Sequence, residues 1–159
     1  MSEKMSSSAQ KVQEALKVHG VACKVVEMKQ TTRTAQDAAE AVGCQVGQIA
    51  KSLVFTGKKS NQPILVIASG PNRVNEKTIR QHIGEPLSMA KAEFVREHTG
   101  FAIGGVPPTG HLKSLKTFID EDLLQFEEIW AAAGTPHAVF KLSPEELKKI
   151  SGGEVISVK

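Results

Sequence analysis

The sequence predicts a single α+β domain built on a mixed, curved β-sheet with helices packed against it. Two observations support this fold class. The expected strands outnumber the helices, and strands paired in hairpins are mixed with strands joined through helices, unlike the regular alternation of a doubly wound parallel sheet. The length of 159 residues suits one domain, and 40% hydrophobic with 23% charged residues is an ordinary globular composition.

Local signals predict the elements of the first half. Residues 1–7 are polar and serine-rich, which predicts a disordered tail in front of a domain that spans 8–159. Thr34, with Asp37 three positions later, has the pattern of a helix start, and Gly43 ends that short helix. The remaining elements are expected as helices at 8–19, from Asn75 to Ile83 and at 89–98, and as strands at 21–28, 49–55 and 63–69, the last two forming a hairpin.

The second half contains more strand than helix. Ser143, Pro144 and Glu146 predict a helix start, because serine is a good N-cap, proline suits the first helical position and glutamate the third. Strands are expected at 115–120, 127–133, 137–142 and 154–158, with 127–133 and 137–142 forming a pair.

The composition excludes several classes of function. A net charge of +3 is compatible with a polyanionic partner but does not require one, and six Phe, one Trp and no Tyr argue against a base-stacking surface. No apolar run approaches the roughly 20 residues of a membrane span, and the N-terminus has no hydrophobic signal region. Cys23 and Cys44 form no metal or redox motif. These features predict a cytoplasmic protein that does not bind membranes.

Familiar catalytic motifs are missing from the sequence. It contains no GxGxxG, no GxxxxGK[ST], no GxSxG and no HExxH, and its five histidines lack the spacing of metal ligands. We therefore expect no metal site and no cofactor. Cys44 follows a predicted helix end, where the helix dipole disfavours a thiolate, so a small buried hydrophobe is the better interpretation than a nucleophile.

Lys51 interrupts an apolar strand face. If 49–55 is a strand, the alternate residues from Ile49 to Phe55, Lys51 among them, share a bulky face that we expect to point to the core. Burying an ammonium group without a partner is costly, so a lysine on this face would meet an anion or lie at a cleft. The alternative is that its stem packs while the amine reaches water, and spacing alone leaves both open.

The loop GGVPPTG at 104–110 is the second unusual feature. Gly104 and Gly105 permit positive φ and close approach of a ligand to backbone N–H groups. Pro107 and Pro108 then stiffen the chain and remove competing donors. Amides held in this way can bind a carbonyl oxygen or its oxyanion, although a tight turn between strands explains the same residues.

Taken together, these segments resemble the YbaK/ProX family of freestanding aminoacyl-tRNA deacylases, which is related to the editing insertion of bacterial prolyl-tRNA synthetases. The resemblance covers residues 8–158 and implies a partly barrel-like mixed sheet flanked by helices, the YbaK-like fold. It is carried by the lysine in IAKSLVF, the strand PILVIAS, the segment HTGFAIGGVPPTGH, then KTFID and GTPHAVFKL.

The resemblance implies an enzyme that acts in trans on the ester between a wrong amino acid and the 3′ acceptor end of tRNA. The expected partner is aminoacyl-tRNA, not DNA, and a synthetase partner is left open. Because an aminoacyl ester is already activated, a positioned water and oxyanion stabilisation suffice, without a covalent nucleophile. The family pattern places the catalytic residues at Lys51, Gly104 and Gly105 and the substrate-binding residues at Val106, Pro107, Pro108 and His137.

The last inference from the sequence concerns which amino acid the enzyme removes from tRNA. The stretch TTRTAQDAA at 31–39, together with GGVPP instead of a GGISP-like form, favours the branches that act on Ser, Thr or Ala rather than on Cys. Thr32, Thr34, Ser69 and His137 are the candidates for polar contacts to a substrate hydroxyl.

Three alternatives remain at this point. The chain could be a non-catalytic tRNA- or synthetase-binding module with the same fold, a hydrolase of small free esters, or a hydrolase that depends on a metal not visible in the motifs. Deacylation of a panel of mischarged tRNAs, with Lys51→Ala as control, tests the first. Equal turnover of a simple amino-acid ester and the full aminoacyl-tRNA would favour the second, and sensitivity to chelators tests the third.

Overall fold

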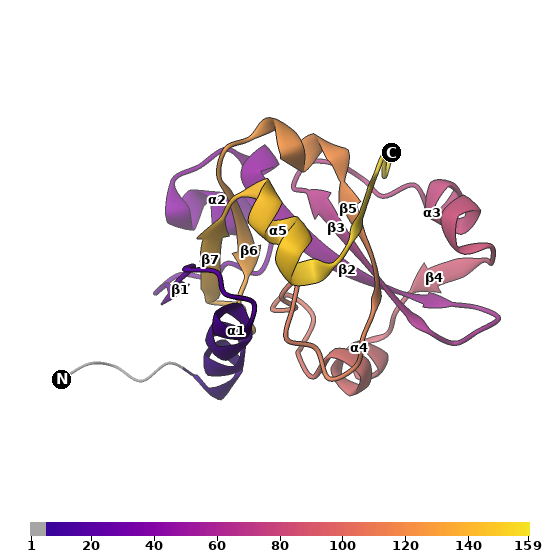
Figure 1. Ribbon diagram of the computed structural model, residues 1–159, viewed down its shortest axis with the longest axis horizontal. Coiled ribbons are helices and arrows are strands. Elements are labelled where there is room, and N and C mark those ends of the chain that lie inside the picture. The colour runs from indigo at the N-terminus through magenta and orange to yellow at the C-terminus, as the bar shows by residue number, and fades with distance from the viewer. Residues whose placement is uncertain (1–5) are drawn as a thin grey trace.

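The protein, described over residues 6–159 by a computed structural model, is organised around one mixed sheet (Figure 1). In the described part of the chain the strand order is β1-β7-β6-β2-β3-β5-β8, and β4 pairs with β2 beside this path. The pairs β3–β5, β5–β8 and β2–β6 are parallel and the others antiparallel, which confirms the predicted mixed sheet. The strands are β1 (Val25–Glu27), β2 (Ile49–Gly57), β3 (Pro63–Ser69), β4 (Leu87–Met89), β5 (Lys116–Asp120), β6 (Ile129–Ala132), β7 (Ala138–Leu142) and β8 (Glu154–Ile156).

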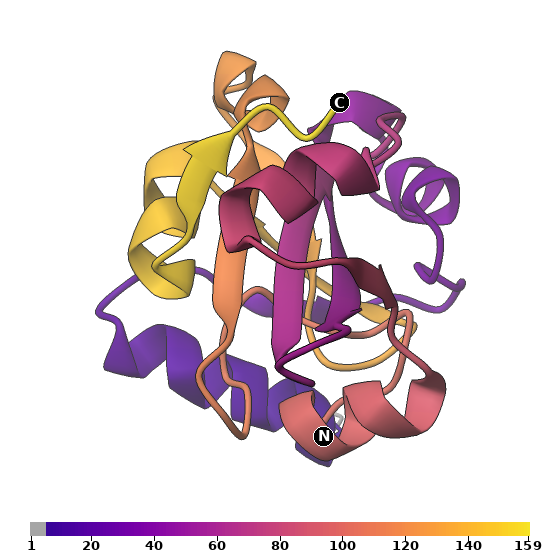
Figure 2. The ribbon, with the colours of Figure 1, turned by 90° about the vertical axis from the view of Figure 1, so that its right-hand side faces the viewer.

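Helices cover both faces of the sheet. α1, α4 and α5 contribute to the larger apolar core, whereas α3 packs over the smaller one and crosses in front of the central strands in Figure 2. Within residues 6–159, no helix combines the length and apolar character needed to cross a membrane. The α-helices are α1 (Ser7–Val18), α2 (Ala35–Val42), α3 (Glu76–Ile83), α4 (Ala92–Thr99) and α5 (Pro144–Ser151), and the 3₁₀ helices are η1 (Val46–Gln48) and η2 (Glu121–Gln125).

Three helix caps form where the sequence predicts them. The Thr34 hydroxyl accepts the Asp37 N–H at 3.0 Å, which caps α2. Ser143 and Glu146 form the reciprocal capping box of α5, with distances of 3.1 Å and 2.8 Å. The Asn75 side chain caps α3 in the same way.

Several predicted boundaries differ from those of the structure. α1 begins at Ser7, because Ser6 caps it, and residues 1–5 of the predicted tail lie outside the described residues. The strand expected at 21–28 is reduced to β1. The helix expected at 89–98 becomes β4 followed by α4, because 87–89 pair with β2.

The prediction that the face of β2 carrying Lys51 points to the main core is wrong. Ala50 and Val54, on the face opposite Lys51, belong to the larger cluster, while Phe55 packs with Ile79 of α3 in the smaller one. Both faces are buried because helices lie on both sides of the sheet, so the bulkier face does not identify the main core.

Removing the α5 cap tests this local account of the fold. In Ser143→Ala the Glu146 N–H loses its acceptor, and we expect the free energy of unfolding to fall by about 1 kcal/mol in urea denaturation. Ser114→Ala is the matched control, because Ser114 is exposed, and it should change stability by less than about 0.5 kcal/mol. Equal losses in the two variants would contradict the capping role.

Candidate active site

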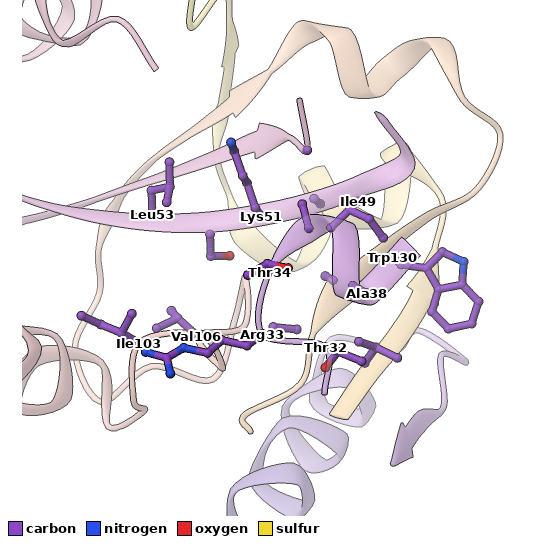
Figure 3. Close-up of a pocket in the computed structure, with 18 residues that line it drawn as sticks. Thr32, Arg33, Thr34, Ala38, Ile49, Lys51, Leu53, Ile103, Val106 and Trp130 are labelled. Atoms are coloured by element: carbon purple, nitrogen blue, oxygen red, sulfur yellow. The ribbon is translucent and has the colours of Figure 1, made fainter. Parts of the chain in front are cut away.

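A cavity of about 420 Å³ lies beside β2, where that strand changes neighbours (Figure 3). β3 runs along one edge of β2, so β6, at Ile49 and Ala50, and β4, from Phe55 to Gly57, share the other edge. Between them the edge has no paired strand in the described part of the chain. The cavity fills this gap, and its walls are largely apolar, including Ala38, Ile103, Val106, Trp130, Ala131 and Val139.

The glycine loop forms one side of the cavity. Gly104 lines it with a φ of +90°, which favours glycine, and a Cβ there would lie 2.7 Å from the Arg33 Cγ, so a larger residue would also displace the arginine side chain. Among residues 6–159, the Gly104 N–H has no hydrogen-bond acceptor. This amide is therefore available to a ligand.

Gly105 does not offer a free amide. Its N–H donates to the Ala102 carbonyl at 3.0 Å, and its carbonyl accepts the Gly134 N–H at 2.8 Å. A Cβ on Gly105 would lie 2.8 Å from the Thr135 nitrogen. The expected role of this amide in oxyanion binding is therefore corrected: Gly105 is required for close packing against the 134–135 turn.

The rest of the loop divides between the cavity and the interior. Val106 lines the cavity, but Pro107 and Pro108 do not, contrary to the expectation that both contact substrate. The Pro107 carbonyl accepts a hydrogen bond from His111 Nε2 at 2.6 Å, and burial lowers the pKa of this histidine. The hydrogen bond with His111 thus fixes the loop at Pro107, outside the cavity lining.

Lys51 lines the cavity wall, but its amine does not face the glycine loop. In Figure 3 the side chain extends from β2 to the side opposite Arg33 and Val106. Burial lowers the pKa of the Lys51 amine; the Asp120 carboxylate opposes this shift, and the Arg73 guanidinium adds to it. Lys51 is therefore a half-buried cation near a buried carboxylate.

Most of the polar residues expected to contact a substrate hydroxyl already have hydrogen-bond partners in the protein or lie outside the cavity lining. Thr32 and Thr34 line the cavity, but the Thr32 hydroxyl donates to the Pro136 carbonyl at 3.1 Å and Thr34 caps α2. Ser69 lies outside the lining, with its hydroxyl on the Gly47 carbonyl at 2.6 Å. His137 is exposed, does not line the cavity and contacts the Gln30 carbonyl through Nδ1.

Arg33 is a site residue that the sequence reasoning missed. Its side chain lies along the cavity beside Gly104, and within residues 6–159 no carboxylate forms an ion pair with it. Figure 3 shows it reaching towards Ile103 and Val106. The sequence feature that could have identified it is an arginine between two threonines, the second of which, Thr34, is the predicted helix cap.

Neither cysteine belongs to the cavity lining. Burial raises the pKa of the Cys44 thiol, and burial with the Glu146 carboxylate raises the pKa of Cys23 to about 11. Both thiols are therefore poor nucleophiles near neutral pH. Among residues 6–159 there is also no group of three or more His, Cys, Asp or Glu side chains placed to hold a metal ion.

Comparisons with known proteins agree on one family. Residues 29–150 match the family model described as the aminoacyl-tRNA editing domain. The chain is 34% identical over 131 residues to the uncharacterized protein YwhH of Bacillus subtilis (strain 168), covering 82% of this chain and 83% of YwhH. It is 26% identical over 126 residues to EbsC of Enterococcus faecalis (strain ATCC 700802 / V583), named as a candidate Cys-tRNA(Pro)/Cys-tRNA(Cys) deacylase, covering 79% and 76%.

A solved structure extends the similarity to the whole fold. A crystal structure described as a candidate trans-editing enzyme for prolyl-tRNA synthetase superposes with a TM-score of 0.92 at 50% identity. The match covers 98% of this chain and 99% of that one.

Replacing Gly105 tests the contact between the loop and the 134–135 turn. In Gly105→Ala the new Cβ must displace the Thr135 backbone, so we expect a loss of about 1–3 kcal/mol in unfolding free energy. The Gly134 amide should also lose hydrogen-exchange protection, because its acceptor is the Gly105 carbonyl.

Gly84→Ala is the control for this variant. It meets nothing within 4 Å and only strains a φ of +79°, so it should cost about 1 kcal/mol without changing exchange at Gly134. Unchanged protection of the Gly134 amide in Gly105→Ala would refute the contact.

Proposed function

The chain belongs to the aminoacyl-tRNA editing domain family, and from that premise we propose that it hydrolyses, in trans, the ester of tRNA mischarged with a small amino acid such as Ser, Thr or Ala. The family and the fold that the sequence predicts are confirmed by the family match and by the whole-chain superposition. The expected enzyme class, an aminoacyl-tRNA deacylase, agrees with the names of the relatives.

One observation carries the proposal: Gly104, whose N–H has no acceptor among residues 6–159, lines a cavity that Arg33 and Lys51 also line and whose lining contains no nucleophilic triad. Water attacks the ester carbonyl carbon, and negative charge develops on the carbonyl oxygen. A fixed backbone N–H that faces this oxygen stabilises the charge without any reorganisation. The carbon–oxygen ester bond then breaks, the 3′ oxygen of the ribose takes up a proton, and the amino acid leaves as a carboxylic acid that ionises.

The two cations have different positions and therefore different proposed roles. Arg33 lies beside Gly104, where its guanidinium can bind a phosphate of the acceptor end in bidentate fashion. Lys51 points away from the glycine loop, which favours contact with the terminal phosphate over a direct contact with the ester. The ribose hydroxyl or the substrate amine then places the attacking water.

The lining supports a substrate with a small apolar or weakly polar side chain. Trp130, Ile49 and Val139 give the cavity an apolar wall, and no carboxylate of the described residues lines it to pair with a basic side chain. A pocket of this kind separates neighbouring amino acids by only about 1–3 kcal/mol per methylene, so several small residues are accepted. EbsC, named for Cys-tRNA, is a more distant relative at 26% identity, and Cys-tRNA belongs in the test panel.

Deacylation of a panel of tRNAs charged with Ser, Thr, Ala, Cys and Pro tests the proposal. The wild-type chain should release the small amino acids, and Arg33→Ala and Lys51→Ala should each lower kcat/KM about 10–100-fold, since each removes one charged contact. Lys17→Ala removes an exposed cation from α1, away from the cavity, and should stay within about twofold.

The panel also separates the rival functions. Tight tRNA binding without release of any amino acid would favour a non-catalytic module. Full activity of Lys51→Ala would remove Lys51 from the mechanism, and equal turnover of simple amino-acid esters would favour a small-molecule hydrolase.

Chelation provides an independent prediction. The proposed chemistry uses only backbone and cationic groups, so deacylation rates should be the same before and after extensive dialysis against EDTA. Loss of activity that returns with added Zn²⁺ would show that a metal performs the hydrolysis.

A further inference from the structure

Ser52 has a buried side-chain hydroxyl that lacks a partner in the described part of the chain. Its hydroxyl oxygen is buried, with less than 1 Å² of accessible surface, and it is the one buried side-chain N or O atom among residues 6–159 that forms no hydrogen bond. A buried hydroxyl without a partner costs free energy relative to its solvated state. Because Ser52 lines the cavity, rotation about its χ1 angle can turn this unpaired hydroxyl towards a ligand bound there.

The backbone of Ser52 faces the same gap. The Val54 carbonyl accepts the Ala90 N–H at 3.0 Å, so the peptide groups of Val54 point to the β4 side of β2. Peptide groups alternate along a strand, and those of Ser52, two residues earlier, point to the same edge. That edge is the one left unpaired between β6 and β4. Ser52 thus presents a donor and an acceptor besides its hydroxyl.

Ser52 also lies where two cavities meet. It lines the large cavity and a smaller one of about 50 Å³, which is bounded by Val54, Ala90 and Val95. Gly104 lines both as well, so an ester carbonyl bound at its N–H would lie next to the small cavity. A space of this size has room for a group of one or two heavy atoms.

From this arrangement we propose that Ser52 determines specificity: its free hydroxyl hydrogen-bonds the side-chain hydroxyl of a seryl group, and the enzyme prefers Ser over Ala. This inference rests on the proposed deacylase function and names the polar contact within its site. The hydroxyls of Thr32, Thr34 and Ser69 already have partners, whereas that of Ser52 does not. A site built to bond a hydroxyl discriminates strongly against the analogue that lacks it, because its own polar group is then left unpaired.

The test compares Ser and Ala esters of one tRNA in wild type, Ser52→Ala, Ser52→Thr and Ser114→Ala. We expect Ser52→Ala to lower kcat/KM for the seryl ester about tenfold or more and to leave the alanyl ester within twofold. Ser52→Thr keeps the hydroxyl and should retain the preference for Ser. Ser114→Ala, an exposed serine, should change neither rate.

A stability measurement separates this role from a structural one. Because the Ser52 hydroxyl bonds nothing in the protein, Ser52→Ala should melt at the same temperature as wild type or higher. A lower Tm together with equal losses on both esters would assign Ser52 to the fold and overturn the proposal. Unchanged rates on both esters would overturn it as well.

Binding of stable analogues distinguishes failure of this inference from failure of the proposed function. Calorimetry with 3′-seryl-amide and 3′-alanyl-amide derivatives of adenosine requires no hydrolysis. Tighter binding of the seryl amide, lost in Ser52→Ala, supports the contact even if no charged tRNA is deacylated. Equal binding of both amides in wild type, alongside normal deacylation, leaves the function intact and rejects the Ser52 contact.

Discussion

The exchange of partners along one edge of β2 is the constraint on which the site depends. β6 runs parallel to the first residues of this strand and β4 antiparallel to its last, so the two neighbours approach from different directions and do not meet. The intervening residues keep a full partner, β3, on the other edge and remain extended. A sheet normally satisfies its own peptide groups, and here it leaves some of them facing a cavity.

The electrostatics of the site depend on a buried carboxylate at the end of β5. Asp120 is completely buried and accepts the Ser69 N–H at 2.9 Å and an Asn72 amide hydrogen at 2.8 Å. Its charge partly offsets the cost of burying the Lys51 ammonium. Burial still lowers the pKa of the Lys51 amine, and the Asp120 carboxylate limits that shift.

The sequence predicts the parts of this protein that have local causes. The caps at Thr34 and Ser143 need only residues three positions apart, and the β2–β3 hairpin needs two apolar runs and a turn. Lys51 and Gly104 could be selected because each departs from the local pattern. The packing of Gly105 against the 134–135 turn and the unpaired hydroxyl of Ser52 could not, because they depend on neighbours brought in by distant chain segments.

The packing around Gly134 determines which parts of the cavity can move. Gly134 donates to the Gly105 carbonyl, and a Cβ on Gly134 would lie 2.7 Å from the Ser8 carbonyl oxygen in α1. Helix α1, the β6–β7 turn and the glycine loop are therefore packed against one another. Moving the glycine loop outward would break its hydrogen bond with Gly134 and disturb the β6–β7 turn, which packs against α1. On the side of Arg33, in contrast, the cavity can widen by a change of rotamer, because this long exposed side chain moves without any change in the backbone.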